Sequence, residues 1–189
     1  MKLRVVVSAV VAVLLFAICF AGRLLPHPPN ATPVAAVALF AGFYFRHRLV
    51  AFAIPTLGML ASDAIIGTYN WKLMCTIYVA LILPVLFKKF LQKLKPHRVG
   101  VCSVAASLVF FVATNLGVWL FTSHYSKDIV GIGSCFAAAI PFLKYTIIGD
   151  LFWNTVFFGT YGFANSSLPS RITNSLTSAL RNGRPVRVG

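Results

Sequence analysis

Long apolar stretches separated by short polar breaks dominate the chain. The stretches cover Val5 to Gly22, Pro33 to Phe45, Leu49 to Ser62, Leu73 to Phe87 and Val99 to Phe121, with a last one that ends at Ala164. A helix needs about 20 such residues to cross a bilayer. The pattern predicts an all-α polytopic membrane protein with six transmembrane helices over residues 1–164 and a basic, polar tail over residues 165–189.

Three of the predicted helices leave alternatives open. The stretches at 33–45 and 49–62 are short for a full span, so they are tilted, extended into their loops, or shielded from lipid by neighbouring helices. The first stretch follows Lys2 and Arg4 and also fits a secretory signal peptide. We favour an uncleaved first helix, because the later topology then closes consistently.

Composition supports the membrane interpretation. Of 189 residues, 59% are hydrophobic and only 11% are charged, against about 25% charged in an ordinary soluble domain. The net charge of +14 would suggest nucleic acid for a soluble protein. Here the basic residues punctuate apolar stretches instead, which is typical of membrane loops. We therefore expect the lipid bilayer as a partner and no nucleic acid.

The distribution of basic residues predicts the orientation. With the N-terminus inside, 13 basic residues fall in inner segments and three in outer loops, namely Arg23, Lys72 and Lys127. The positive-inside rule then places both ends of the chain in the cytoplasm, with the protein in a bacterial inner membrane. The inner residues are Lys2, Arg4, Arg46, Arg48, Lys88, Lys89, Lys93, Lys95, Arg98, Arg171, Arg181, Arg184 and Arg187.

This topology gathers polar and aromatic residues in three outer segments, 23–33, 63–72 and 122–140. They form either a ligand site or an interfacial belt with loop caps. Asp150 and Asn115 lie inside predicted spans, where a polar group needs a partner, a cavity or water. Asp150 either ties helices together, through Lys144 or Asn115, or contacts a ligand. The candidate ligand-binding residues are His27, Asn30, Asp63, Asn70, Trp71, Cys75, Asn115, Trp119 and Asp150.

Several functions are disfavoured by what the sequence lacks. There is no phosphate-binding G-x-x-x-x-G-K-[ST] loop, and without glutamate no H-E-x-x-H metal motif is possible. We expect neither an enzyme nor a resident cofactor. Small residues paired at i and i+4, such as Ala38 with Gly42, permit close helix contact. They make the second helix a candidate for docking another membrane protein.

Several motifs resemble an uncharacterised bacterial family of six-helix membrane proteins. They are Pro26-His-Pro-Pro-Asn30, Ser62-Asp63, Thr114-Asn-Leu-Gly-Val-Trp119, Ala139-Ile-Pro-Phe142 and Gly149-Asp-Leu151. That family is similar to the substrate-binding S components of energy-coupling-factor (ECF) vitamin transporters. The resemblance covers most of residues 20–160.

The resemblance implies uptake of a vitamin or similar micronutrient through an outward-facing small-molecule site. It further implies a transmembrane coupling subunit and ATPases as partners. In the solitary vitamin B12 branch the ligand is cobalamin, and a cysteine binds its cobalt. Cys75 would be that metal ligand here, since a soft thiolate suits a cobalt centre. Two alternatives remain: a structural or assembly protein without a ligand, which would have a well-packed outer surface, and a small solitary permease with a continuous polar path.

The charge asymmetry makes a testable prediction about topology. A reporter that is active only in the cytoplasm should be active when fused after Gly189, because the basic segments retain that end inside. Activity of a reporter that works only in the periplasm would contradict this orientation.

Overall fold

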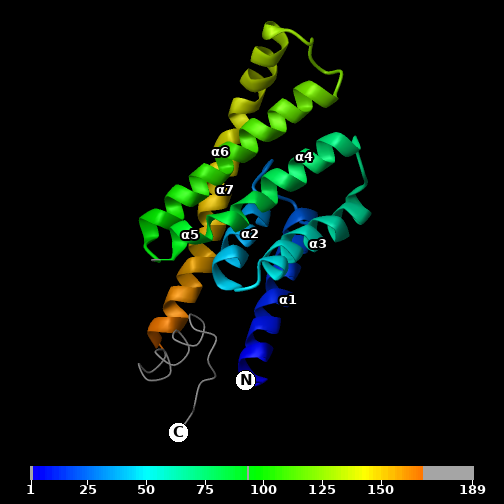
Figure 1. The fold of residues 1–189 in the computed structure, drawn as a ribbon. Coiled ribbons are helices and arrows are strands. Elements are labelled where there is room, and N and C mark those ends of the chain that lie inside the picture. The colour runs from blue at the N-terminus through cyan, green and yellow to red at the C-terminus, as the bar shows by residue number, and fades with distance from the viewer. Residues whose placement is uncertain (1, 93, 168–189) are drawn as a thin grey trace.

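The described part of the chain is a bundle of helices. The computed structural model describes residues 2–92 and 94–167, and every regular element in these ranges is helical. Figure 1 shows their arrangement. The elements are α1 (Lys2–Leu24), α2 (Val34–Tyr44), α3 (Arg48–Ile66), α4 (Trp71–Ile82), the 3₁₀ helix η1 (Leu83–Phe87), α5 (Lys88–Leu91), α6 (Pro96–Phe121) and α7 (Ile129–Ser167).

Five of the predicted membrane spans have the length that crossing requires. In the described residues, α1, α3, α4 with η1 and α5, α6 and α7 are long and apolar enough to cross a membrane. Helix α2 has 11 residues and is therefore about 16 Å long, about half the thickness of the hydrocarbon core. The all-helical class is confirmed. The remaining predicted span, over residues 33–45, is this shorter helix.

Successive spans alternate in direction, with α4, η1 and α5 together forming one of them. Helix α1 begins and α7 ends at the same, lower end of the bundle in Figure 1. The loop before α4 and the turn before α7 lie toward the other end. Most of the predicted tail, residues 168–189, lies outside the described residues.

Local sequence signals explain several helix boundaries. Helix α3 stops at Gly67, whose φ of 104° is unfavourable for residues with a side chain. Asn70 caps α4, because its side-chain oxygen accepts hydrogen bonds from the backbone N–H groups of Lys72 at 3.0 Å and Leu73 at 3.3 Å. Helix α6 begins at Pro96, whose ring suits a first helical position.

The third predicted outer segment is partly helical. Of residues 122–140, only 122–128 form a turn, because α7 already begins at Ile129. Asp128 starts the helix: its carboxylate accepts the backbone N–H of Gly131 at 2.6 Å and the hydroxyl of Ser126 at 2.8 Å. These two hydrogen bonds, the backbone one first, hold the pKa of Asp128 below its ordinary value.

Helix α2 lies at the centre of the bundle. It is in contact with every other helix of the described chain, and all residues from Val34 to Gly42 are buried. Near its C-terminal end, the ring of Phe40 packs against Phe157 and Phe158 of α7, with centroid distances of 5.8 and 5.2 Å. Of the three alternatives for the short predicted spans, shielding from lipid is the one that applies to α2.

This burial overturns the expectation that the small residues of α2 dock a partner protein. Ala38 is fully buried, and a Cβ added to Gly42 would lie 2.5 Å from the backbone oxygen of Val85. The small side chains therefore permit α2 and η1 to pack backbone against backbone inside this chain. A bulky residue there would disturb the fold itself.

The contact between Gly42 and Val85 leads to a prediction about stability. Gly42→Ala should lower the free energy of unfolding by about 1–3 kcal/mol, because the new methyl group overlaps the η1 backbone. Gly100→Ala in α6 is the matched control, since a Cβ there meets nothing within 4 Å. Unfolding in mixed detergent micelles compares the two variants. Equal stability would show that α2 and η1 are not in close contact.

Candidate functional site

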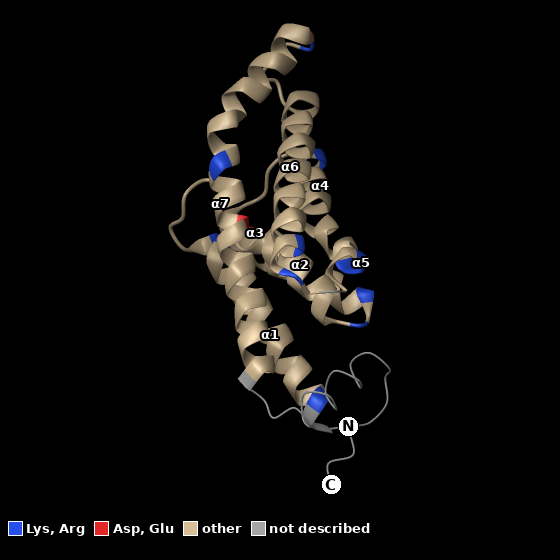
Figure 2. Cartoon of the chain, turned by 90° about the vertical axis from the view of Figure 1, so that its left-hand side faces the viewer, with Lys and Arg blue, Asp and Glu red and all other residues tan. Residues whose placement is uncertain are grey.

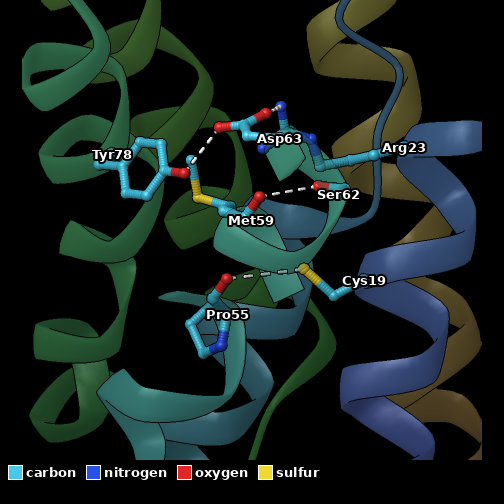
Figure 3. Close-up of polar contacts among 7 residues, drawn as sticks. All are labelled: Cys19, Arg23, Pro55, Met59, Ser62, Asp63 and Tyr78. Carbon is cyan, nitrogen blue, oxygen red and sulfur yellow. Dashed lines mark hydrogen bonds and ion pairs between the residues drawn. The ribbon is translucent and has the colours of Figure 1, made fainter. Parts of the chain in front are cut away.

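A buried ion pair joins α1 to α3 (Figure 3). The guanidinium of Arg23 binds the carboxylate of Asp63, whose side chain is 3% exposed. The hydroxyl of Tyr78, on α4, donates to the other carboxylate oxygen at 2.6 Å. One turn deeper, the thiol of Cys19 is 3.8 Å from the backbone oxygen of Pro55. Both carboxylate oxygens therefore have partners, and three helices are held together at this level.

A cavity of about 310 Å³ lies beside this ion pair. It is lined by the end of α1 and the loop after it, the start of α2, and residues of the α3–α4 loop, α4, α6 and α7. Its exposed members come from the two loops. The lining residues are Arg23, His27, Asn30, Thr32, Val34, Ala35, Tyr69, Ile77, Leu81, Phe110, Thr146 and Asp150.

Two sets of hydrogen-bond donors at this cavity lack a side-chain partner. Nη1 of Arg23 is buried and has no hydrogen-bond partner in the described part of the chain. Helix α2 begins at the cavity with Val34 and Ala35, and no side chain caps its first turn. The free N–H groups of a helix N-terminus carry a partial positive charge. This end of the cavity is therefore suited to an anionic group.

The opposite wall combines apolar and polar surface. Ile77, Leu81 and Phe110 supply the apolar part, and Thr146 and Asp150 are buried polar residues one helical turn apart on α7. Asp150 is 3% exposed and accepts a hydrogen bond from the hydroxyl of Ser107 at 2.6 Å. The cavity can thus contact both an apolar body and polar substituents.

The charges of the ion pair also act on Tyr69, a residue of the cavity lining. It lies between α3 and α4, and its pKa is raised first by burial and then by the nearby carboxylate of Asp63. Arg23 acts in the opposite direction. The phenol is therefore a neutral hydrogen-bonding group at the cavity.

The predicted partners of Asp150 are not the ones that the structure shows. Lys144 lies six residues earlier, about 240° round the helix, and its Nζ is 4.9 Å from the ring centroid of Tyr145. Asn115 donates to the backbone oxygen of Phe111 at 2.7 Å. Asp150 ties α7 to α6, as one expectation had it, but does so through Ser107.

The predicted ligand-binding residues separate into two groups. His27, Asn30 and Asp150 line the cavity. Asp63 does not line it but binds Arg23, which does. Asn30 has a φ of 63°, a left-handed conformation that asparagine tolerates, so it also shapes the loop. The other five, which do not line the cavity, are Asn70, Trp71, Cys75, Asn115 and Trp119.

Structural roles account for several residues of the second group. Asn70 caps α4, and its amide also donates to the backbone oxygen of Phe121 at 3.1 Å. The indole N–H of Trp119 donates to the backbone oxygen of Ser126 at 2.8 Å and closes the α6–α7 turn. Trp71 is 70% exposed. Cys75 is exposed and lies two residues before the lining residue Ile77, about 200° round α4.

Arg23 and Tyr69 are functional candidates that the sequence analysis did not select. Arg23 was counted only as one of three outer basic residues. A signal was available: Arg23 and Asp63 are opposite charges at the outer ends of the first and third predicted spans. Ions at that depth need partners, which favours such a pair.

The fold is all-helical, with several helices apolar enough to span a membrane and a small, partly polar cavity at the start of α2. The chain belongs to DUF6580, a family of unknown function, which matches residues 3–171. No curated protein and no solved structure matches the chain.

The ion pair generates a prediction about stability. Asp63→Asn should lower the free energy of unfolding by about 3 kcal/mol or more, because it leaves the largely buried guanidinium of Arg23 without a counter-ion. Tyr78→Phe should cost less, about 1.5 kcal/mol, since it removes one hydrogen bond to the same carboxylate. Unfolding in mixed detergent micelles measures both. A larger loss of stability for Tyr78→Phe than for Asp63→Asn would contradict the larger contribution expected of the ion pair.

Proposed function

We propose that this protein binds a small organic solute at the outer face of a bacterial inner membrane and serves its uptake, in the manner of an S component. The cavity beside Arg23 and Asp63 is the observation that carries the proposal. Its volume of about 310 Å³ is at the lower end of the range of small-molecule sites, and its mixed lining is typical of them. Both ends of the chain would be cytoplasmic, and the protein would not be an enzyme.

The preferred solute carries an anionic group, such as a carboxylate, on a compact apolar body. The unpartnered nitrogen of Arg23 and the uncapped start of α2 favour the anion. Ile77, Leu81 and Phe110 favour the apolar body. Because the Asp63 carboxylate already offsets the charge of Arg23, a solute would gain mainly a directed hydrogen bond there.

Cobalamin receives no support from this geometry. Cys75, the proposed cobalt ligand, is exposed on another face of α4 and does not line the cavity. A corrin macrocycle with its nucleotide is also much larger than this site. A smaller micronutrient fits the cavity better, with a coupling subunit and ATPases as the partners that an S component requires.

A solitary permease is the second candidate, because a line of buried polar side chains continues from the cavity. Along the α6–α7 contact, Ser107 donates to Asp150, and the amide of Asn154 donates to the hydroxyl of Ser103 at 3.0 Å. Asn154 lies one turn beyond Asp150, and its Oδ1 is buried without a partner in the described residues. A structural protein without a ligand would have a well-packed outer surface, so the cavity favours binding.

Mass spectrometry of small molecules retained by the gently solubilised protein tests solute binding. We expect a retained anionic compound, with at least about tenfold less on His27→Ala, because His27 lines the cavity. His124→Ala is the matched control, since this exposed histidine of the α6–α7 turn does not line it.

Two results would count against the proposal. One is a wild-type protein that retains no compound and is stabilised by none in a library of carboxylates. The other is equal loss of the compound from the His27 and His124 variants.

A further inference from the structure

A second cavity lies at the opposite end of α2. It has a volume of about 190 Å³ and is lined by the end of α2, the start of α3, η1 and α5. Its basic side chains are Arg48, Lys88 and Lys89, and Gln92 adds an amide. In Figure 2, basic segments gather around α5. This cavity is separate from the one beside Arg23.

The backbone around this cavity is held in place by specific contacts. The close approach of Gly42 to Val85 brings α2 against η1. Nζ of Lys88 donates to the backbone oxygen of Phe45 at 2.7 Å, which satisfies a carbonyl at the end of α2. Lys88 is half-buried, so its ammonium is fixed at the wall. Arg48 and Lys89 are exposed and free to approach a bound group.

The cations of this cavity have no acidic side chain of their own chain to neutralise them. The sequence contains three acids and no glutamate. Asp63 binds Arg23, Asp128 starts α7, and Asp150 accepts from Ser107. Three basic side chains around a small cavity therefore attract an anion from outside the protein.

The surroundings of the cavity indicate the source of that anion. Leu86, which lines the cavity, is 52% exposed. Leu49, beside Arg48, is 84% exposed, and Phe90, beside Lys89, is 66% exposed. A free phosphate ion would use only the cations. An amphiphile would use the cations and this apolar rim together.

We propose that this cavity binds the phosphate head group of an anionic phospholipid, with the acyl chains along Leu86, Leu49 and Phe90. Basic pockets between helices near the membrane surface are suited to such head groups. The site is independent of solute binding at the other end of α2. A lipid bound there contacts the junction of α2, η1 and α5 and stabilises it.

Native mass spectrometry of the delipidated, full-length protein in neutral detergent tests the site. The probes are dioleoyl phosphatidylglycerol, dioleoyl phosphatidylcholine and inorganic phosphate. We expect one phosphatidylglycerol to bind at least about fivefold more tightly than phosphatidylcholine. Arg48→Gln and Lys89→Gln should each weaken phosphatidylglycerol binding about fivefold. Lys95→Gln, which removes the same charge outside the cavity, should change it less than about twofold.

Each alternative outcome overturns the proposal in a different way. An equal effect of Lys95→Gln would mean diffuse attraction to a basic surface. Equal binding of phosphatidylcholine would mean that no anionic head group is selected. Stabilisation by inorganic phosphate that is abolished by Arg48→Gln, without lipid binding, would identify a free-phosphate site. Because Arg48 and Lys89 are exposed, unchanged helicity and elution volume should confirm that both variants fold.

Discussion

A helix of 11 residues at the centre of the bundle constrains the rest of the structure. Helix α2 spans about 16 Å, about half of a hydrocarbon core, so at least one of its ends lies at membrane depth, where unpaired backbone groups are costly. The surrounding helices are all in contact with it and bury it from Val34 to Gly42. Lys88 satisfies a carbonyl at one end of α2, and the other end opens onto the cavity beside Arg23.

The two cavities follow from the same constraint. A helix shorter than its neighbours leaves space beyond its ends, unless side chains fill it. At the start of α2 the space has polar walls from two loops and from α7. At its end, the lining is basic. Each end thus presents chemistry that matches its side of the proposed orientation: a solute site outside and a lipid head-group site inside.

Sequence patterns were sufficient for the helices and their order. In a chain with so few charges, apolar runs of 13 residues or more, separated by short polar breaks, fit a helical membrane bundle and little else. Pattern could not show that the run from Pro33 is buried rather than facing lipid, because both surroundings select the same side chains. The start of α7 at Ile129 was missed although its signal is local, because Asp128 accepts the backbone N–H of Gly131 only three residues ahead, as a helix-capping residue does.

The site was predictable only where a polar group lay in an unusual position. Asp150 was found because a charge inside a span is rare, and His27 because it lies in an outer segment with other polar residues. Cys75, Asn115 and Trp119 were selected by their level in the membrane, which says nothing of the direction a side chain takes round its helix. Arg23 was overlooked because a charge at a helix end resembles an ordinary loop residue, yet its partner Asp63 lies in another helix.

Cysteine accessibility in intact cells tests the outward-facing cavity most directly. In a variant with all four native cysteines replaced by alanine, Thr32→Cys places a thiol in the cavity lining, and His47→Cys places one in the exposed loop at the opposite end of α2. A membrane-impermeant maleimide added to intact cells should label the cysteine at 32 and leave the one at 47 unlabelled until the cells are opened. Labelling at 47 alone would contradict the orientation, and no labelling at 32 in either preparation would contradict the accessible cavity.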